Sequence, residues 1–105
     1  MKCLDDCHTY ELNYFGQGVA HYDRPGQIHF YEMREDGTKV DGVTNEEVIR
    51  VLIHRLTFLN EKWMDGKFRC QENTLAIMKL HEALMWLKKR TADRQDRGVE
   101  GTREA

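Results

Sequence analysis

The chain has 105 residues, of which 40% are hydrophobic, and a chain of this length corresponds to one domain. A multidomain enzyme is therefore excluded, and the core is too small to enclose a deep substrate cavity. A total of 16 Lys and Arg residues against 18 Asp and Glu residues gives a net charge of −2. The chain as a whole therefore does not attract nucleic acid or anionic lipid, and an anion site requires a local cluster of cations.

The N-terminal segment contains Cys3 and Cys7, two of the three cysteines, and has no apolar stretch long enough for a signal peptide or a membrane span. We therefore expect a cytoplasmic protein with reduced thiols. Cys3, Cys7 and His8 resemble one corner of a zinc site. A structural zinc ion needs four ligands, however, and the other candidate ligands are isolated in the sequence, so we expect no metal.

Residues 8–41 have the pattern of short β-strands. Apolar and polar side chains alternate over residues 10–14 and again over residues 27–33. Asp36-Gly37 marks a tight hairpin turn after the second of these segments. The pattern predicts a small antiparallel sheet of two to four short strands, which needs a packing partner because such a sheet has little stability of its own.

From Thr44 onward the spacing of the apolar residues becomes helical. Thr44 and Glu47 form a capping box, which predicts that a helix starts there and continues to a stop near Asp65-Gly66. At about 100° per residue, its apolar face consists of Val48, Ile49, Leu52, Leu56, Leu59 and Trp63.

A second helix is predicted from residue 71 or 72 to Arg94, with Gly98 as the first residue that clearly ends it. Because the connection between the helices is short, they should form an antiparallel hairpin. The sequence therefore predicts an α+β fold in a single domain, with a small sheet packed on a helical hairpin over residues 44–97 and a tail at 98–105.

The second predicted helix has apolar residues on two opposite sides. One side suffices to pack on the first helix and on the sheet, and it contains Ala76, Ile77, Leu80, Ala83, Leu84 and Leu87. The other side has no partner in a monomer, and it contains Leu75, Met78, Met85 and Trp86. Exposed patches of this kind mark interfaces, so we predict self-association through this helix. The alternative is that Met85 and Trp86 fold under the sheet.

Basic residues cluster at the end of the second helix. At about 100° per residue, Arg90, Arg94 and Arg97 fall on one stripe, which is followed by residues 98–102. Arginine binds phosphate through paired N–H donors, glycine lets backbone amides approach an anion, and Thr102 adds a hydroxyl. Cations at a helix C-terminus also interact favourably with the helix dipole. The stripe therefore fits two roles equally well: a phosphate-binding site, or solvent-exposed charges that only stabilise the end of the helix.

The sequence contains no Gly-x-Ser-x-Gly, no phosphate-binding loop and no His-x-x-x-His pair. His54 and His81 are single residues at the flanks of apolar helix faces, and we interpret them as polar boundary residues. Asp93 and Glu100 are expected to orient guanidinium groups or to contact an amino group of a base, rather than to act as general bases. We therefore expect no catalytic residues and no enzymatic activity.

Several segments together resemble a known family. Glu82-Ala-Leu-Met-Trp86, Arg90-Thr-Ala-Asp-Arg94 and Arg97-Gly-Val-Glu-Gly-Thr102, with Asn73 at the helix start, are similar to the family of Thoeris anti-defence protein one and anti-CBASS protein two. These are small phage proteins that sequester nucleotide second messengers. The similarity extends upstream through residues 26–31, 41–47 and 51–56, so it covers most of the chain.

The resemblance implies a non-enzymatic inhibitor, encoded by a phage or prophage, in the cytoplasm of the infected bacterial host. It implies dimers or hexamers that bind glycocyclic ADP-ribose and cyclic dinucleotides in one kind of site and cyclic trinucleotides in another, with no cofactor and no DNA, RNA or membrane partner. The first site would contain Arg90, Arg94, Asn73, Trp63, Phe68 and Tyr31, with the aromatic rings stacking on bases. The second would contain Arg90, Arg97, Gly98, Glu100 and Thr102.

Two other functions stay open at this point. One is an enzyme that hydrolyses the cyclic signal. The other is a hairpin that serves only oligomerisation or protein interaction. Only the arginine stripe argues against the second of these, because a plain interaction helix does not need it.

Overall fold

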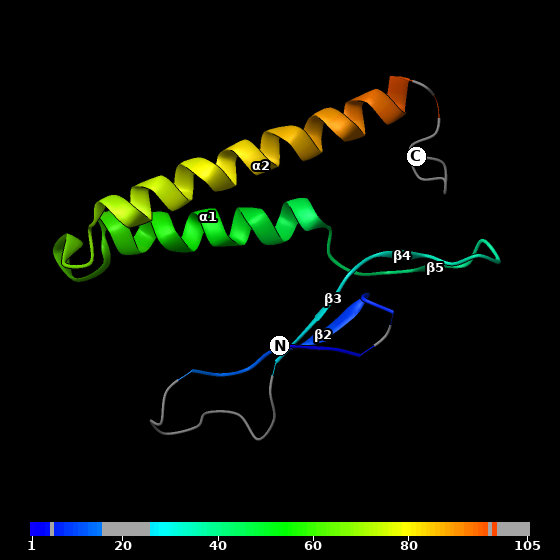
Figure 1. Cartoon of the computed structure of the whole chain (residues 1–105), viewed down its shortest axis with the longest axis horizontal. Coiled ribbons are helices and arrows are strands. Elements are labelled where there is room, and N and C mark those ends of the chain that lie inside the picture. Colours follow the sequence, from blue (N-terminus) through cyan, green and yellow to red (C-terminus); the bar gives the residue numbers. More distant parts are fainter. Residues whose placement is uncertain (5, 16–25, 97, 99–105) are drawn as a thin grey trace. The chain divides into compact units, whose positions relative to one another are not determined.

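The structure is a computed structural model, and it describes residues 1–4, 6–15, 26–96 and 98. The chain divides into two compact units, which we call the N-terminal unit (Met1–Thr44) and the hairpin unit (Asn45–Ala105). Figure 1 shows strands in the first unit and two long helices in the second. This arrangement confirms the predicted α+β fold class. Packing of the sheet on the hairpin and the single domain both stay predictions.

The described part of the N-terminal unit contains two small antiparallel sheets. The first has the order β1-β2-β3 and consists of β1 (Lys2–Cys3), β2 (Thr9–Glu11) and β3 (Gln27–His29). The second pairs β4 (Glu32–Met33) with β5 (Lys39–Val40). The prediction of short antiparallel strands is therefore confirmed, although β1 lies upstream of the predicted region.

The segment that the alternation predicted as one strand, residues 27–33, is interrupted after β3. Phe30 forms a parallel bridge with Val43, supported by a hydrogen bond from the Val43 N–H to the His29 carbonyl oxygen at 2.8 Å. Gly42 makes this close approach possible, because a Cβ atom there would lie 2.5 Å from the Phe30 carbonyl carbon. The local alternation of apolar and polar residues cannot predict a contact between residues this far apart in the sequence.

The predicted hairpin turn at Asp36-Gly37 is present between β4 and β5. Gly37 has a φ of +86°, a conformation that glycine adopts at no steric cost. The Asp36 Oδ1 atom accepts a hydrogen bond from the Thr38 N–H at 2.8 Å. Hydrogen bonds from Thr38 lower the pKa of the Asp36 carboxyl. The turn is thus stabilised by the residue types from which it was predicted.

The hairpin unit consists of α1 (Asn45–Glu61), the short helical turn η1 (Trp63–Gly66) and α2 (Gln71–Asp96). The two long helices run side by side in Figure 1. α1 begins directly after Thr44, as the capping box predicts, but it ends at Glu61, before the predicted stop near Asp65-Gly66, so Trp63 belongs to η1 and not to α1. The antiparallel hairpin that the sequence predicted is therefore confirmed.

One side of α2 is shielded from solvent along its whole length. Its buried and half-buried residues alternate at intervals of four and three, the repeat of a coiled-coil seam, and they are Asn73, Ile77, Leu80, Leu84, Leu87, Thr91 and Arg94. Ala76 and Ala83, which the projection placed on the packed side, are exposed. Leu52 and Trp63 of the predicted α1 face are exposed as well. A single neighbouring helix covers a narrower stripe than the apolar pattern suggests.

Within the described residues, no helix is both long and apolar enough to cross a membrane.

Candidate functional site

The connection between α1 and α2 presents two aromatic rings at one end of the hairpin. Trp63 and Phe68, which we call the loop aromatics, are both exposed. The Trp63 ring lies 5.8 Å from the Phe58 ring, centroid to centroid, at an interplanar angle of 47°. Phe58 therefore supports one side of the indole and leaves much of it open to solvent.

Asn73 belongs to the same end of the hairpin. Its side-chain Nδ2 donates a hydrogen bond to the Phe68 carbonyl oxygen at 3.0 Å. The structure therefore places two residues of the predicted first site, Phe68 and Asn73, in contact, and Trp63 lies in the same connection between α1 and α2. The Asn73 amide, however, already has a partner in the loop.

The two arginines of the first site lie near the opposite end of α2. A rise of about 1.5 Å per residue separates Asn73 and Arg90 by about 25 Å along the helix axis. Arg90 is exposed, whereas Arg94 is only 7% exposed and continues the shielded side of α2. The stripe that the helical projection predicted is therefore split, with one guanidinium in solvent and the other buried.

Tyr31 belongs to the N-terminal unit. Its ring is exposed, and its backbone N–H donates a hydrogen bond to the Val43 carbonyl oxygen at 2.9 Å. Because each unit is described by itself, the role of Tyr31 beside the hairpin residues stays a prediction.

Gly98 is the described member of the predicted trinucleotide site that follows α2. It has a φ of +70°, and its N–H donates to the Gln95 carbonyl oxygen at 3.0 Å. A glycine in this conformation is a common helix end, so Gly98 terminates α2. Arg97, Glu100 and Thr102, three further members of this site, lie outside the described residues.

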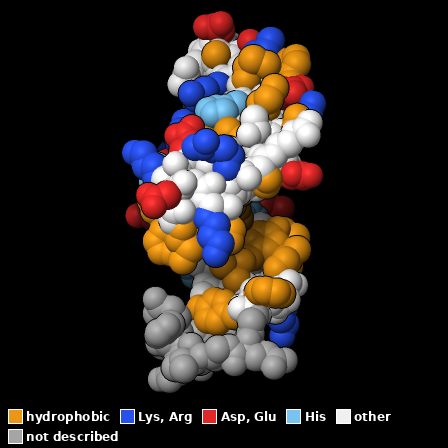
Figure 2. Space-filling view, turned by 90° about the vertical axis from the view of Figure 1, so that its left-hand side faces the viewer, with side chains coloured by type: hydrophobic (Ala, Val, Ile, Leu, Met, Phe, Trp, Pro, Cys, Tyr) orange, Lys and Arg blue, Asp and Glu red, His pale blue; other side chains and the backbone are white. Residues whose placement is uncertain are grey.

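The predicted second apolar side of α2 is exposed in the structure. Its four side chains, which we call the outer patch, are between 47% and 60% exposed, and they are Leu75, Met78, Met85 and Trp86. Figure 2 shows hydrophobic side chains at the surface among charged ones. Within the described residues, Leu84, at 8% exposed, is the only hydrophobic residue that is buried. Because each unit is described by itself, the alternative in which the sheet covers Met85 and Trp86 stays a prediction, as does self-association through this side.

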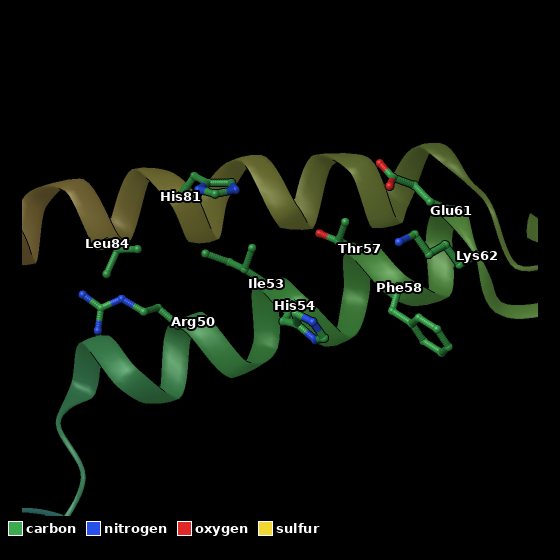
Figure 3. Close-up of a pocket in the computed structure, with 9 residues that line it drawn as sticks. All are labelled: Arg50, Ile53, His54, Thr57, Phe58, Glu61, Lys62, His81 and Leu84. Carbon is green, nitrogen blue, oxygen red and sulfur yellow. The ribbon is translucent and has the colours of Figure 1, made fainter.

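A groove of about 550 Å³ runs along one side of the hairpin (Figure 3). Ile53, Thr57 and Leu84 lie between the two helices, and His54, His81 and Arg50 are also among the lining residues. The Arg50 guanidinium is paired with Glu47 at 3.3 Å. None of the sequence-predicted ligand residues lines this groove. Its two histidines were predicted to be polar boundary residues, and their spacing along the chain contains no motif that would have identified a groove.

The described residues contain no cluster of three or more His, Cys, Asp and Glu side chains that could hold a metal ion. The Sγ atoms of Cys3 and Cys7 lie 3.0 Å apart, and the hydrogen bond with Cys3 lowers the pKa of the Cys7 thiol. The two residues form a thiol pair in an exposed turn, and the part of the chain that the structure describes adds no third or fourth ligand to them.

Comparison with known proteins gives two matches. The family described as "Acb2/Tad1, hairpin domain" matches residues 30–92. A protein of Bacillus phage SBSphiJ7 named "Thoeris anti-defense 1" is 53% identical over 64 residues. The aligned segment covers 61% of this chain and 42% of the phage protein, so the chain spans less than half the length of that relative.

Proposed function

Because the chain belongs to the family of the Acb2/Tad1 hairpin domain, we propose that it is a phage anti-defence protein that binds immune signalling nucleotides and does not degrade them. The name of the similar phage protein supports the anti-defence role. The proposed ligands are glycocyclic ADP-ribose, made in Thoeris defence, and the cyclic di- and trinucleotides of CBASS defence. The proposed place of action is the cytoplasm of the infected bacterial host.

The observation that carries this proposal is where the hairpin holds the side chains that could bind a nucleotide. The loop aromatics offer flat surfaces on which bases can stack, and Arg90 offers a guanidinium that can bind a phosphate through paired donors. Asn73, which is hydrogen-bonded to the Phe68 carbonyl oxygen, lies about 25 Å from Arg90 along α2, so the loop aromatics and Arg90 are at opposite ends of the hairpin. A single hairpin therefore cannot place both on one small cyclic nucleotide, and the proposal requires a second copy of the chain.

The outer patch indicates how a second copy would be arranged. The patch spans residues 75–86 of α2, so its middle lies near residue 81. If two α2 helices pack antiparallel about that point, Arg90 of one copy lies at about the level of Asn73, in the first turn of the other α2. A two-fold dimer would thus bring Arg90 of one copy to the end of the other hairpin that holds the loop aromatics, twice per dimer, while Arg94 stays on the shielded side of its own α2.

In such a dimer the residues have different roles. Arg90 binds a phosphate, Trp63 and Phe68 stack on bases, and Tyr31 adds a further ring. Asn73 and Arg94 contribute from more shielded positions, where a charged group forms stronger interactions than at an open surface. A separate trinucleotide site, with Arg90, Arg97, Gly98, Glu100 and Thr102, would form where several copies meet in a hexamer.

Isothermal titration calorimetry with a panel of ligands tests this proposal. The panel contains glycocyclic ADP-ribose, a cyclic dinucleotide, a cyclic trinucleotide and, as the control, linear ADP-ribose. We expect saturable binding of glycocyclic ADP-ribose at one ligand per chain, because a two-fold dimer repeats the site twice. If none of the cyclic ligands binds, the proposal is overturned.

A further inference from the structure

Asn60 is a polar residue in the last turn of α1, where an amphipathic helix would ordinarily bury an apolar side chain. It is 9% exposed. Burying an amide is unfavourable unless its donors and acceptors are hydrogen-bonded. The bonds that Asn60 makes therefore show what this position does.

Asn60 connects α1 to both the loop and the start of α2. Its Oδ1 accepts a hydrogen bond from the Cys70 N–H at 3.0 Å, and its Nδ2 donates to the Thr74 Oγ1 at 3.2 Å. Its backbone carbonyl oxygen accepts from the Arg69 Nε at 3.1 Å. One buried residue thus holds the far end of the loop in place through three separate atoms.

The loop needs such support because its backbone is strained. Met64 and Asp65 have φ values of +49° and +56°, in the left-handed region that side-chain-bearing residues rarely adopt, and Gly66 follows with a φ of +79°. Strained conformations persist only where the surrounding structure holds them, and they occur preferentially at functional sites. Trp63 precedes this strained segment directly, and Phe68 follows it.

We propose that Asn60 is a positioning residue that holds the α1–α2 loop in its strained form, so that the loop aromatics are in place before a ligand arrives. This inference rests on the proposed function. Asn60 makes no contact with the ligand. It acts by removing the entropic cost of ordering the loop on binding, which increases affinity. The ligand should therefore leave more quickly when Asn60 is replaced.

The main test compares Asn60→Ala with Leu59→Ala, measuring release of glycocyclic ADP-ribose by surface plasmon resonance. Leu59 is the half-buried neighbour on the same helix turn, and its truncation removes apolar contacts but none of the loop hydrogen bonds. We expect Asn60→Ala to release the ligand about tenfold faster than the parent chain, because the loop is no longer pre-organised. Leu59→Ala should keep a release rate close to that of the parent.

Two further variants separate positioning from stability. Thr74→Val removes the partner of the Asn60 Nδ2 and the hydrogen bond from the Thr74 hydroxyl to the Cys70 carbonyl oxygen at 3.4 Å, but it keeps the bond from the Cys70 N–H to the Asn60 Oδ1. It should therefore fold and show a smaller increase in release rate than Asn60→Ala. Adding Asp65→Gly to Asn60→Ala should slow release again, because glycine adopts a positive φ without strain. A residue that contributed only to global stability would not show rescue at this particular loop position.

Hydrogen exchange at the Cys70 amide provides a readout that does not depend on any ligand. We expect faster exchange in Asn60→Ala than in Leu59→Ala. Unchanged exchange in Asn60→Ala, or equal release rates for the two variants, would overturn the positioning role alone. A parent chain that retains no cyclic nucleotide would instead overturn the proposed function and, with it, the effect on ligand release.

Discussion

The side-chain Nδ2 of Asn73 donates a hydrogen bond to the carbonyl oxygen of Phe68 at 3.0 Å. This contact ties the first turn of α2 to the loop that presents the aromatic rings. An asparagine side chain has a second N–H and two acceptor sites, so Asn73 retains capacity for a ligand. Its position therefore couples the shape of the loop to the proposed binding site.

Replacing Asn73 tests this coupling. Asn73→Asp places a carboxylate oxygen against the Phe68 carbonyl and a negative charge beside an anionic ligand, so it should weaken binding more strongly than Asn73→Ala. We expect a loss of about tenfold for Asn73→Ala, the size of one hydrogen bond, and a larger loss for Asn73→Asp. Calorimetry measures both, and equal affinities for the two variants and the parent would place Asn73 outside the site.

Arg90 and Arg94 should differ in what their removal changes. Arg90 is exposed, so Arg90→Ala should weaken binding by about tenfold to a hundredfold, since a hydrogen bond to a charged group contributes about 1.5–3 kcal/mol, and should leave the melting temperature unchanged. Arg94 is buried, so Arg94→Ala should lower both affinity and melting temperature. Lys88→Ala, which removes one positive charge nearby, is the control. A loss of affinity in Lys88→Ala equal to that in Arg90→Ala would indicate a general charge effect.

The outer patch should mediate self-association. Met85→Glu or Trp86→Glu introduces a charge into an apolar contact and should dissociate the assembly into single chains, because a desolvated and unpaired charge is costly. Analytical ultracentrifugation at several concentrations measures this change. Lys79→Glu is the control, since that side chain is 80% exposed on the same helix. If both patch variants sediment like the parent, another surface must hold the copies together.

The thiol pair of the N-terminal unit should have an unusual pH dependence. The hydrogen bond from Cys3, with a further contribution from Tyr10, lowers the pKa of the Cys7 thiol. Because the thiolate is the nucleophile, the alkylation rate of Cys7 increases with pH. The midpoint of this increase should lie at a lower pH in the parent than in Cys3→Ala. Mass spectrometry of iodoacetamide-treated protein over a pH series measures the midpoint for each. Identical midpoints in the two proteins would show that Cys3 does not stabilise the thiolate.

Much of the hairpin could be predicted from the sequence because its ends depend on local chemistry. The capping box at Thr44 and the glycines at 66 and 98 each act within a few residues: α1 begins after Thr44, η1 ends at Gly66, and α2 ends shortly before Gly98. The interruption after β3 could not be predicted in this way. It depends on Gly42 and Val43 approaching Phe30, a contact that no local alternation encodes.

The candidate site was harder to predict than the fold, for two physical reasons. Helical projection places Arg90 and Arg94 on one stripe, but the shielded side of α2 passes through Arg94 and leaves Arg90 in solvent. Asn60 was missed because a polar residue in an amphipathic repeat resembles a surface position until its three hydrogen-bonded atoms are seen.

The most direct test of the central claim asks whether the chain captures its ligand and returns it intact. The protein is incubated with glycocyclic ADP-ribose, passed through a filter that retains protein, washed and then denatured by heat. Liquid chromatography with mass spectrometry then identifies what is released. The account predicts that the ligand stays with the native protein and that unaltered glycocyclic ADP-ribose is recovered after denaturation. Recovery of a hydrolysed product, or passage of all the ligand through the filter, would contradict it.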